Sequence, residues 1–138
     1  MSLATKLTIN ATVPLLQNDP KSFISTYWFK ILSALLPGTK VVQVPVTGFS
    51  ITVSDGVETL ILDPAGTLAT GTVILPASAN DGDIFNLTSS QTITGLTVSP
   101  SNGQSVKNAP TALTVSTTAP MGYSFIYNSS NSTWYRLR

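Results

Sequence analysis

Residues 72–87, TVILPASANDGDIFNL, contain the pattern on which the fold prediction rests. An apolar stretch ends at Pro76, a short polar loop follows, and a second apolar stretch begins after Asp83. Runs of β-branched and aromatic residues bounded by Pro, Gly, Asn and Asp are typical of short strands joined by turns. The sequence therefore predicts a strand, a turn and a second strand in this region.

The loop within this stretch brings together two carboxylates, Asp81 and Asp83, on either side of Gly82. Carboxylate oxygens are calcium ligands, but calcium takes six to eight oxygens, and the spacing of an EF-hand loop is absent. An Asp-Gly pair also supplies the positive φ angle that tight turns need. We therefore interpret Asp81-Gly82-Asp83 as a turn and predict no metal ligand in the chain.

The same alternation of apolar segments and turn residues extends over residues 39–138. The expected strands are KVVQVPV, FSITVSD, ETLILDP, GTVILP, DIFNLTS, QTITGLTVSP, TALTVSTT, YSFIYN and TWYRLR. Pro45 indicates an edge strand or a strand end, and residues 128–132 predict a hairpin that places Trp134 and Tyr135 opposite Tyr127 and Phe125. Tight turns cannot join parallel neighbours, so we expect an antiparallel β-sandwich or barrel-like domain.

Residues 1–38 have a different pattern. Residues 1–20 predict an extended arm, because polar and apolar residues alternate until Pro14. Asp19 before Pro20 is a favourable helix start, and Pro37-Gly38 is a favourable helix end. Between them the apolar residues recur at helical spacing, so residues 21–38 predict one amphipathic helix and a linker. The fold class is therefore mainly β, with an arm and one α-helix before the β domain.

The arm and the helix supply the predicted interface residues. An alternating apolar arm can add a strand to an exposed sheet edge of a partner, and an apolar helix face can pack against sister chains. The residues that we expect at an oligomer or capsid interface are Leu7, Ile9, Val13, Leu15, Phe23, Tyr27, Trp28, Ile31 and Leu35.

Composition limits the chemistry that the chain can perform. The 138 residues include no histidine and no cysteine, which excludes imidazole catalysis, thiolate nucleophiles and cysteine-zinc sites. Charged residues make up 9% of the chain, against roughly 25% in a typical soluble protein. Such a surface is covered by Ser, Thr and Asn, or lies against copies of the chain or a partner. We expect a protein that is not an enzyme and has no cofactor.

Charge and hydropathy also bear on the partners. Residues 1–40 carry four lysines and one aspartate, whereas residues 41–135 carry five acidic residues and one lysine. Four dispersed lysines are far from a polybasic tail, so no nucleic-acid partner is expected. The longest apolar run is much too short to span a membrane, and no signal-peptide pattern precedes it, so no membrane partner is expected either.

The order of landmarks in the β half resembles small domains of structural proteins in tailed-bacteriophage virions. The residues that carry this resemblance are LILDPAGTLATGTVILP, the Asp81-Gly82 pair, GLTVSPSNGQSV and the closing YSFIYNSSNSTWYRLR. The resemblance covers roughly residues 49–138 and does not extend to residues 1–48. Related modules occur in head decoration proteins, head fibres, and tail fibres or spikes, usually as homotrimers. The resemblance therefore implies a homotrimer and a place in the virion, with synthesis in the bacterial host cytoplasm.

Two functions follow from this resemblance, and one alternative lies outside it. The first is a homotrimeric capsid decoration (cement) protein on the outer head surface, bridging major capsid subunits through its arm. The second is a tail fibre or spike-associated adsorption module that binds a host glycan and anchors to tail proteins. The third is a free-standing carbohydrate-binding or hydrolytic domain, in which Asp63 or Asp81 would act in glycan cleavage. Short size, without a long coiled coil or receptor-binding tip, favours the first.

Overall fold

The computed structural model describes residues 38–116 and 122–138. The chain divides into two compact units, Met1–Pro37 and Gly38–Arg138, and the described residues all belong to the second. Within the described ranges no helix is long and apolar enough to cross a membrane. The predicted arm and helix, with all nine predicted interface residues from Leu7 to Leu35, lie outside the described residues.

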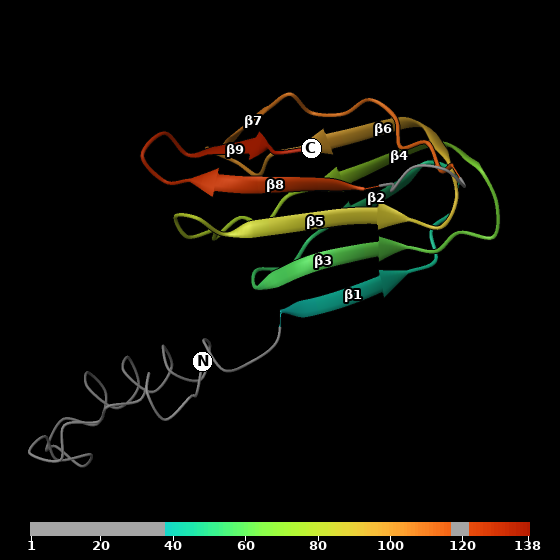
Figure 1. Cartoon of the computed structure of the whole chain (residues 1–138), viewed down its shortest axis with the longest axis horizontal. Helices are drawn as coiled ribbons and strands as arrows, with labels where there is room; N and C mark the ends of the chain where they lie inside the picture. The colour runs from blue at the N-terminus through green and yellow to red at the C-terminus, as the bar shows by residue number, and fades with distance from the viewer. Residues whose placement is uncertain (1–37, 117–121) are drawn as a thin grey trace, which may run out of the picture. The chain divides into compact units, whose positions relative to one another are not determined.

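The described unit is built from short strands (Figure 1). The strands are β1 (Thr39–Gln43), β2 (Phe49–Thr52), β3 (Val57–Leu62), β4 (Leu68–Ile74), β5 (Ile84–Ser89), β6 (Ile93–Ser99), β7 (Ser105–Lys107), β8 (Tyr123–Asn128) and β9 (Thr133–Arg136). Valine, isoleucine, threonine and aromatic residues dominate most of them, as is usual for strands.

Successive strands alternate between two sheets. One sheet has the order β1-β3-β5-β8-β9-β7 and the other has the order β2-β4-β6. The pairs β1/β3, β3/β5, β2/β4 and β4/β6 are all parallel. The arrows of β1, β3 and β5 accordingly point the same way in Figure 1. This arrangement is solenoid-like: β1 and β2 form a first rung, β3 and β4 a second, and β5 and β6 a third.

The core lies between the sheets because equivalent positions of successive rungs stack on one another. On the three-stranded sheet, Ile51 pairs with Val73 and Val73 pairs with Val98. On the facing sheet, Leu60 pairs with Leu87. Alternate residues of each strand point inward, so these ladders bury apolar side chains along the stack. Val73, Leu60 and Leu87 are at most 1% exposed.

The stack is closed at its third rung by the chain itself. The hairpin β8–β9 continues the larger sheet with antiparallel pairs, and β7 pairs in parallel with β9. On the smaller sheet, Leu113 forms an antiparallel bridge with Ile93, and Leu96 N donates to Thr111 O at 2.9 Å. Both sheets are therefore covered beside the third rung.

The prediction of an antiparallel sandwich or barrel was wrong in its strand pairing, although the domain is mainly β as expected. The prediction assumed that strands adjacent in sequence pair with each other. Here the strand between two parallel neighbours lies in the other sheet, so each connection includes a strand and two turns. That length satisfies the reach that parallel pairing requires.

The positions of most individual strands were predicted correctly. Eight of the nine expected segments overlap a strand, and Pro45 follows the end of an edge strand as predicted. Trp134 pairs with Tyr127 as expected, but Tyr135 pairs with Ile126 and not with Phe125. The expected strand at 111–118 is not formed in its described residues, where the only β pairing is the Leu113 bridge to Ile93. The short strand β7 was missed.

Candidate functional site

The first rung carries the most exposed apolar surface of the described residues. Val42 lies in β1, and Val44 and Val46 follow in the segment after it, alternating with Gln43 and Pro45. The three valines are 51%, 72% and 75% exposed, whereas Pro45 between them is buried. We call Val42, Val44 and Val46 the valine row. The valine row is a candidate protein contact surface, because apolar side chains grouped on the surface of a chain with few charges favour burial against another chain.

Both strands of the first rung lie at sheet edges. β1 is the first strand of the larger sheet and β2 is the first strand of the smaller one, so one side of each pairs with no described strand. β1 has protective features, since Lys40, Pro45 and a register shift between Thr39 and Lys40 oppose strand addition. β2, with the sequence FSIT, has no charge, proline or bulge of this kind.

The interior of the first rung is only partly covered. Val41, Phe49 and Ile51 point toward the core but remain partly exposed. Their counterparts one rung further on are buried, as Leu60 and Val73 show. The open end of the stack therefore presents apolar interior, two strand edges and the valine row together.

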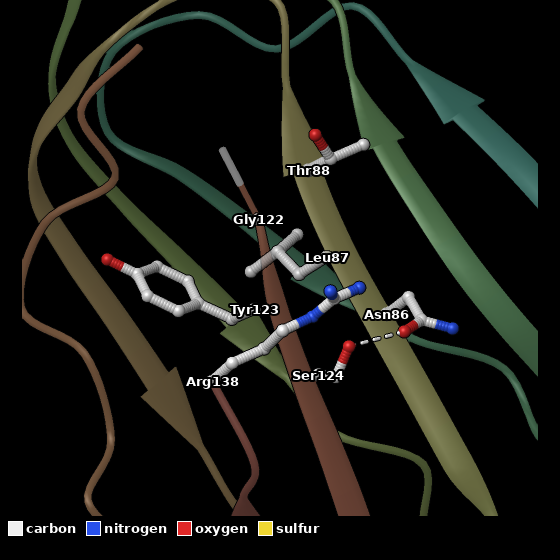
Figure 2. Close-up of a pocket in the computed structure, with 7 residues that line it drawn as sticks. All are labelled: Asn86, Leu87, Thr88, Gly122, Tyr123, Ser124 and Arg138. Atoms are coloured by element: carbon white, nitrogen blue, oxygen red, sulfur yellow. Dashed lines mark hydrogen bonds between the residues drawn. The ribbon is translucent and has the colours of Figure 1, made fainter. Parts of the chain in front are cut away.

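A second candidate lies on the larger sheet where β5 meets β8. A depression of about 490 Å³ is lined by Asn86, Leu87, Thr88, Gly122, Tyr123, Ser124 and Arg138. Ser124 Oγ donates to Asn86 Oδ1 at 2.7 Å, and Asn86 Nδ2 donates to Glu58 O at 3.3 Å. Figure 2 shows the Arg138 side chain extending toward Asn86. We call this depression the β5–β8 groove.

Several polar groups of the β5–β8 groove already have partners within the protein. Asn86 already uses its amide within the protein, which leaves the Arg138 guanidinium as the main available donor. The Tyr123 hydroxyl also has a partner, since it donates to Ala112 O at 2.6 Å. The Tyr123 ring lies under the Arg136 guanidinium, 5.4 Å from its centroid, and this cation–π contact holds the ring in place.

The Asp81-Gly82-Asp83 segment is a turn, as predicted. Gly82 has a φ of 82°, and Asp83 Oδ2 accepts a 2.8 Å hydrogen bond from Asn80 N. Asp81 Oδ1 accepts hydrogen bonds from Ser129 N at 2.9 Å and Ser129 Oγ at 3.2 Å. The two carboxylates thus hold the loop and attach it to the turn between β8 and β9.

The remaining acidic groups of the β domain are spread out. Among the described residues no group of three or more His, Cys, Asp or Glu side chains could hold a metal ion. Asp63 accepts a hydrogen bond from Ser90 Oγ at 2.5 Å. The Ser78 backbone N–H donates to Asp55 Oδ1 at 2.8 Å, and this hydrogen bond lowers the pKa of the Asp55 carboxyl. These contacts join neighbouring turns of the stack.

The aromatic side chains that could stack on sugars are mostly interior. Phe125 and Trp134 are at most 1% exposed, and the Tyr127 and Trp134 rings lie 5.1 Å apart. Trp134 Nε1 donates to Gln104 Oε1 at 3.1 Å, which satisfies its polar atom inside the fold. These rings stabilise the hairpin and the core.

Sequence reasoning missed both candidate surfaces. The segment KVVQVPV did contain a signal for the valine row, because three valines at every second position follow an edge strand flagged by Pro45. The β5–β8 groove had no such signal, since Asn86 and Ser124 are 38 residues apart in sequence.

Comparison with known proteins leaves the family of the chain open. No protein-family model matches the sequence. A search of curated proteins also finds no match.

Proposed function

We propose that this chain is a non-enzymatic structural protein of a tailed-bacteriophage virion. In this proposal it is a homotrimeric capsid decoration (cement) protein, bound to the outer head surface and bridging major capsid subunits through residues 1–20. The observation that carries the proposal is the first rung, where the exposed valine row adjoins two strands whose outer edges pair with no described strand. Such a surface suits a body that works through contacts with other protein chains.

Two further features support the proposal. The described body is stacked from parallel rungs, and its aspartates and aromatic residues join turns and fill the core. Many modest contacts per trimer can add up to tight attachment on a repetitive capsid, because linked sites bind with a high effective concentration. The resemblance of residues 49–138 to phage virion modules points in the same direction.

A second candidate function is a tail-associated adsorption module that binds a host glycan. The observation that favours it is the β5–β8 groove, in which Arg138 and Ser124 offer polar groups beside a hollow of about 490 Å³. The groove ranks second because most of its polar atoms already bond within the protein.

The copy number of the protein in purified virions tests the proposal. We expect quantitative mass spectrometry to give a number of copies of the same order as the major capsid protein, because a cement protein covers the whole head. A handful of copies per particle would place the protein on the tail and favour the adsorption module. Absence from purified virions would contradict both functions.

A further inference from the structure

We propose that Asn102 is a site of spontaneous covalent modification, at which its side-chain amide is lost through attack by the Gly103 backbone nitrogen. The two residues are the only Asn-Gly pair in the 138-residue sequence. Both are exposed, in the turn that joins β6 to β7. Asparagine is a chemically labile residue, and a following glycine leaves its side chain open to attack, because glycine has no Cβ to hinder the backbone nitrogen.

The turn leaves both reacting groups available. Gln104 N donates to Ser101 O at 3.0 Å, and Gly103 has a φ of 80°, which together are the pattern of a type II turn. Neither the Gly103 N–H nor the Asn102 side chain forms a hydrogen bond with another described residue. A Cβ atom built at Gly103 would meet nothing within 4 Å. Solvent can therefore reach the nitrogen that attacks and the amide that is attacked.

The turn at residues 80–83 has the same shape but holds its reacting groups. Gly82 has a φ of 82°, and the turn is closed by the same type of backbone hydrogen bond. Asp81 precedes this glycine, and its Oδ1 atom accepts a hydrogen bond from Ser129 N at 2.9 Å. Gly82 N donates to Tyr127 O at 2.9 Å, so the equivalent backbone nitrogen is engaged. The turn between β6 and β7 has neither form of protection among the described residues.

The reaction that we infer forms a bond between the Gly103 nitrogen and Asn102 Cγ. The Gly103 N–H gives up its proton to solvent, and the bond from Cγ to the side-chain nitrogen breaks. That nitrogen takes up a proton from solvent and leaves as ammonia. Water then opens the resulting cyclic imide at either carbonyl carbon. The products are aspartate, with the original backbone, and isoaspartate, in which the backbone runs through the former side chain and contains an extra carbon atom.

Isoaspartate at this position would displace the residue that ends the turn. The Gln104 side chain joins two parts of the body, because its Nε2 donates to Ala77 O at 2.9 Å and its Oε1 accepts from Trp134 Nε1 at 3.1 Å. A longer backbone before Gln104 moves it away from these partners and leaves the buried Trp134 donor unpaired, which is costly. Aspartate leaves the backbone unchanged. We therefore expect isoaspartate, and not aspartate, to lower the melting temperature.

The test incubates the folded full-length protein in mildly alkaline buffer and follows each asparagine by peptide mass spectrometry. We expect conversion of amide to acid to accumulate at Asn102, and protein isoaspartyl methyltransferase to label the same peptide. Asn108 is the internal control, because it is also exposed but is followed by Ala109. In Asn102→Gln the side chain is longer and does not readily form the same ring, so conversion at this position should be lost.

Two outcomes would overturn the inferred site. One is reaction at Asn102 in urea without reaction in the folded protein, because the turn would then protect the pair. The other is equal conversion at Asn108, because selectivity would not come from the glycine. Thermal unfolding of the aged protein tests the consequence, with Asn102→Asp as the matched control for the added charge. Equal melting of the isoaspartate-containing protein and this control would overturn the displacement of Gln104. The reaction needs no capsid, so its outcome is separate from the proposed function.

Discussion

At the residue scale, the join between the first and second rungs depends on one glycine. Gly71 on β4 pairs with Phe49 on β2, and a Cβ atom built at Gly71 would overlap the Phe49 ring. The ring therefore occupies the space that a side chain at position 71 would fill. A large residue and a missing side chain complement each other across the rungs, as interior packing requires.

We predict that Gly71→Ala destabilises the fold by about 1–3 kcal/mol, because the added methyl group displaces the Phe49 ring. The measurement is urea unfolding followed by circular dichroism. Gly66→Ala is the matched control, since a Cβ there meets nothing within 4 Å, and its effect should stay within about 0.5 kcal/mol. In a Phe49→Leu background the cost of Gly71→Ala should shrink, and equal costs in both backgrounds would contradict the packing argument.

At the element scale, the loop before β5 and the β8–β9 hairpin are held together by side-chain and backbone bonds. Asp81 accepts two hydrogen bonds from Ser129, 48 residues further along the chain. Gly82 N also donates to Tyr127 O at 2.9 Å, and Tyr127 N donates to Asp83 O at 2.9 Å. These bonds fix the hairpin against β5, and the hairpin in turn covers the third rung.

We predict that Asp81→Ala destabilises the fold by about 1 kcal/mol, because the Ser129 backbone N–H loses a carboxylate acceptor at an exposed site. Thermal unfolding measures the loss. The same experiment with and without millimolar calcium separates a structural loop from a metal site. A calcium-dependent rise in the wild-type melting temperature that disappears in Asp81→Ala would contradict the turn interpretation.

The sequence predicts where the strands lie but does not predict which strands pair. Strand positions were predictable because Val, Ile and Thr alternate with polar residues between Gly, Pro and Asp turns, as in DIFNLTS at 83–89. Pairing was not, because a strand such as β3 has the same local pattern whether its neighbour is β4 or β5. What decides between them is the stacking of Leu60 on Leu87 and of Val73 on Val98, contacts made only after the chain has turned through another sheet.

At the scale of the whole molecule, the body and the predicted arm have separate tasks in the proposed function. The hydrophobic core cluster of the described residues is made of side chains between Val53 and Trp134. The described residues also form a compact unit that begins at Gly38. Attachment to the capsid can therefore depend on residues 1–20 while the stability of the β body depends on the stacked rungs.

We predict that deleting residues 1–20 leaves the β body folded and abolishes binding to empty capsids. The physical reason is that the rungs retain their whole described core, whereas the contacts proposed to cross capsid subunits are lost. Circular dichroism measures folding, and cosedimentation with empty capsids measures binding. Asp81→Ala is a suitable control, because it weakens the body without touching the arm and should still cosediment with capsids. Full affinity in the deletion variant would show that another surface attaches the protein, and the β5–β8 groove would be the next to mutate.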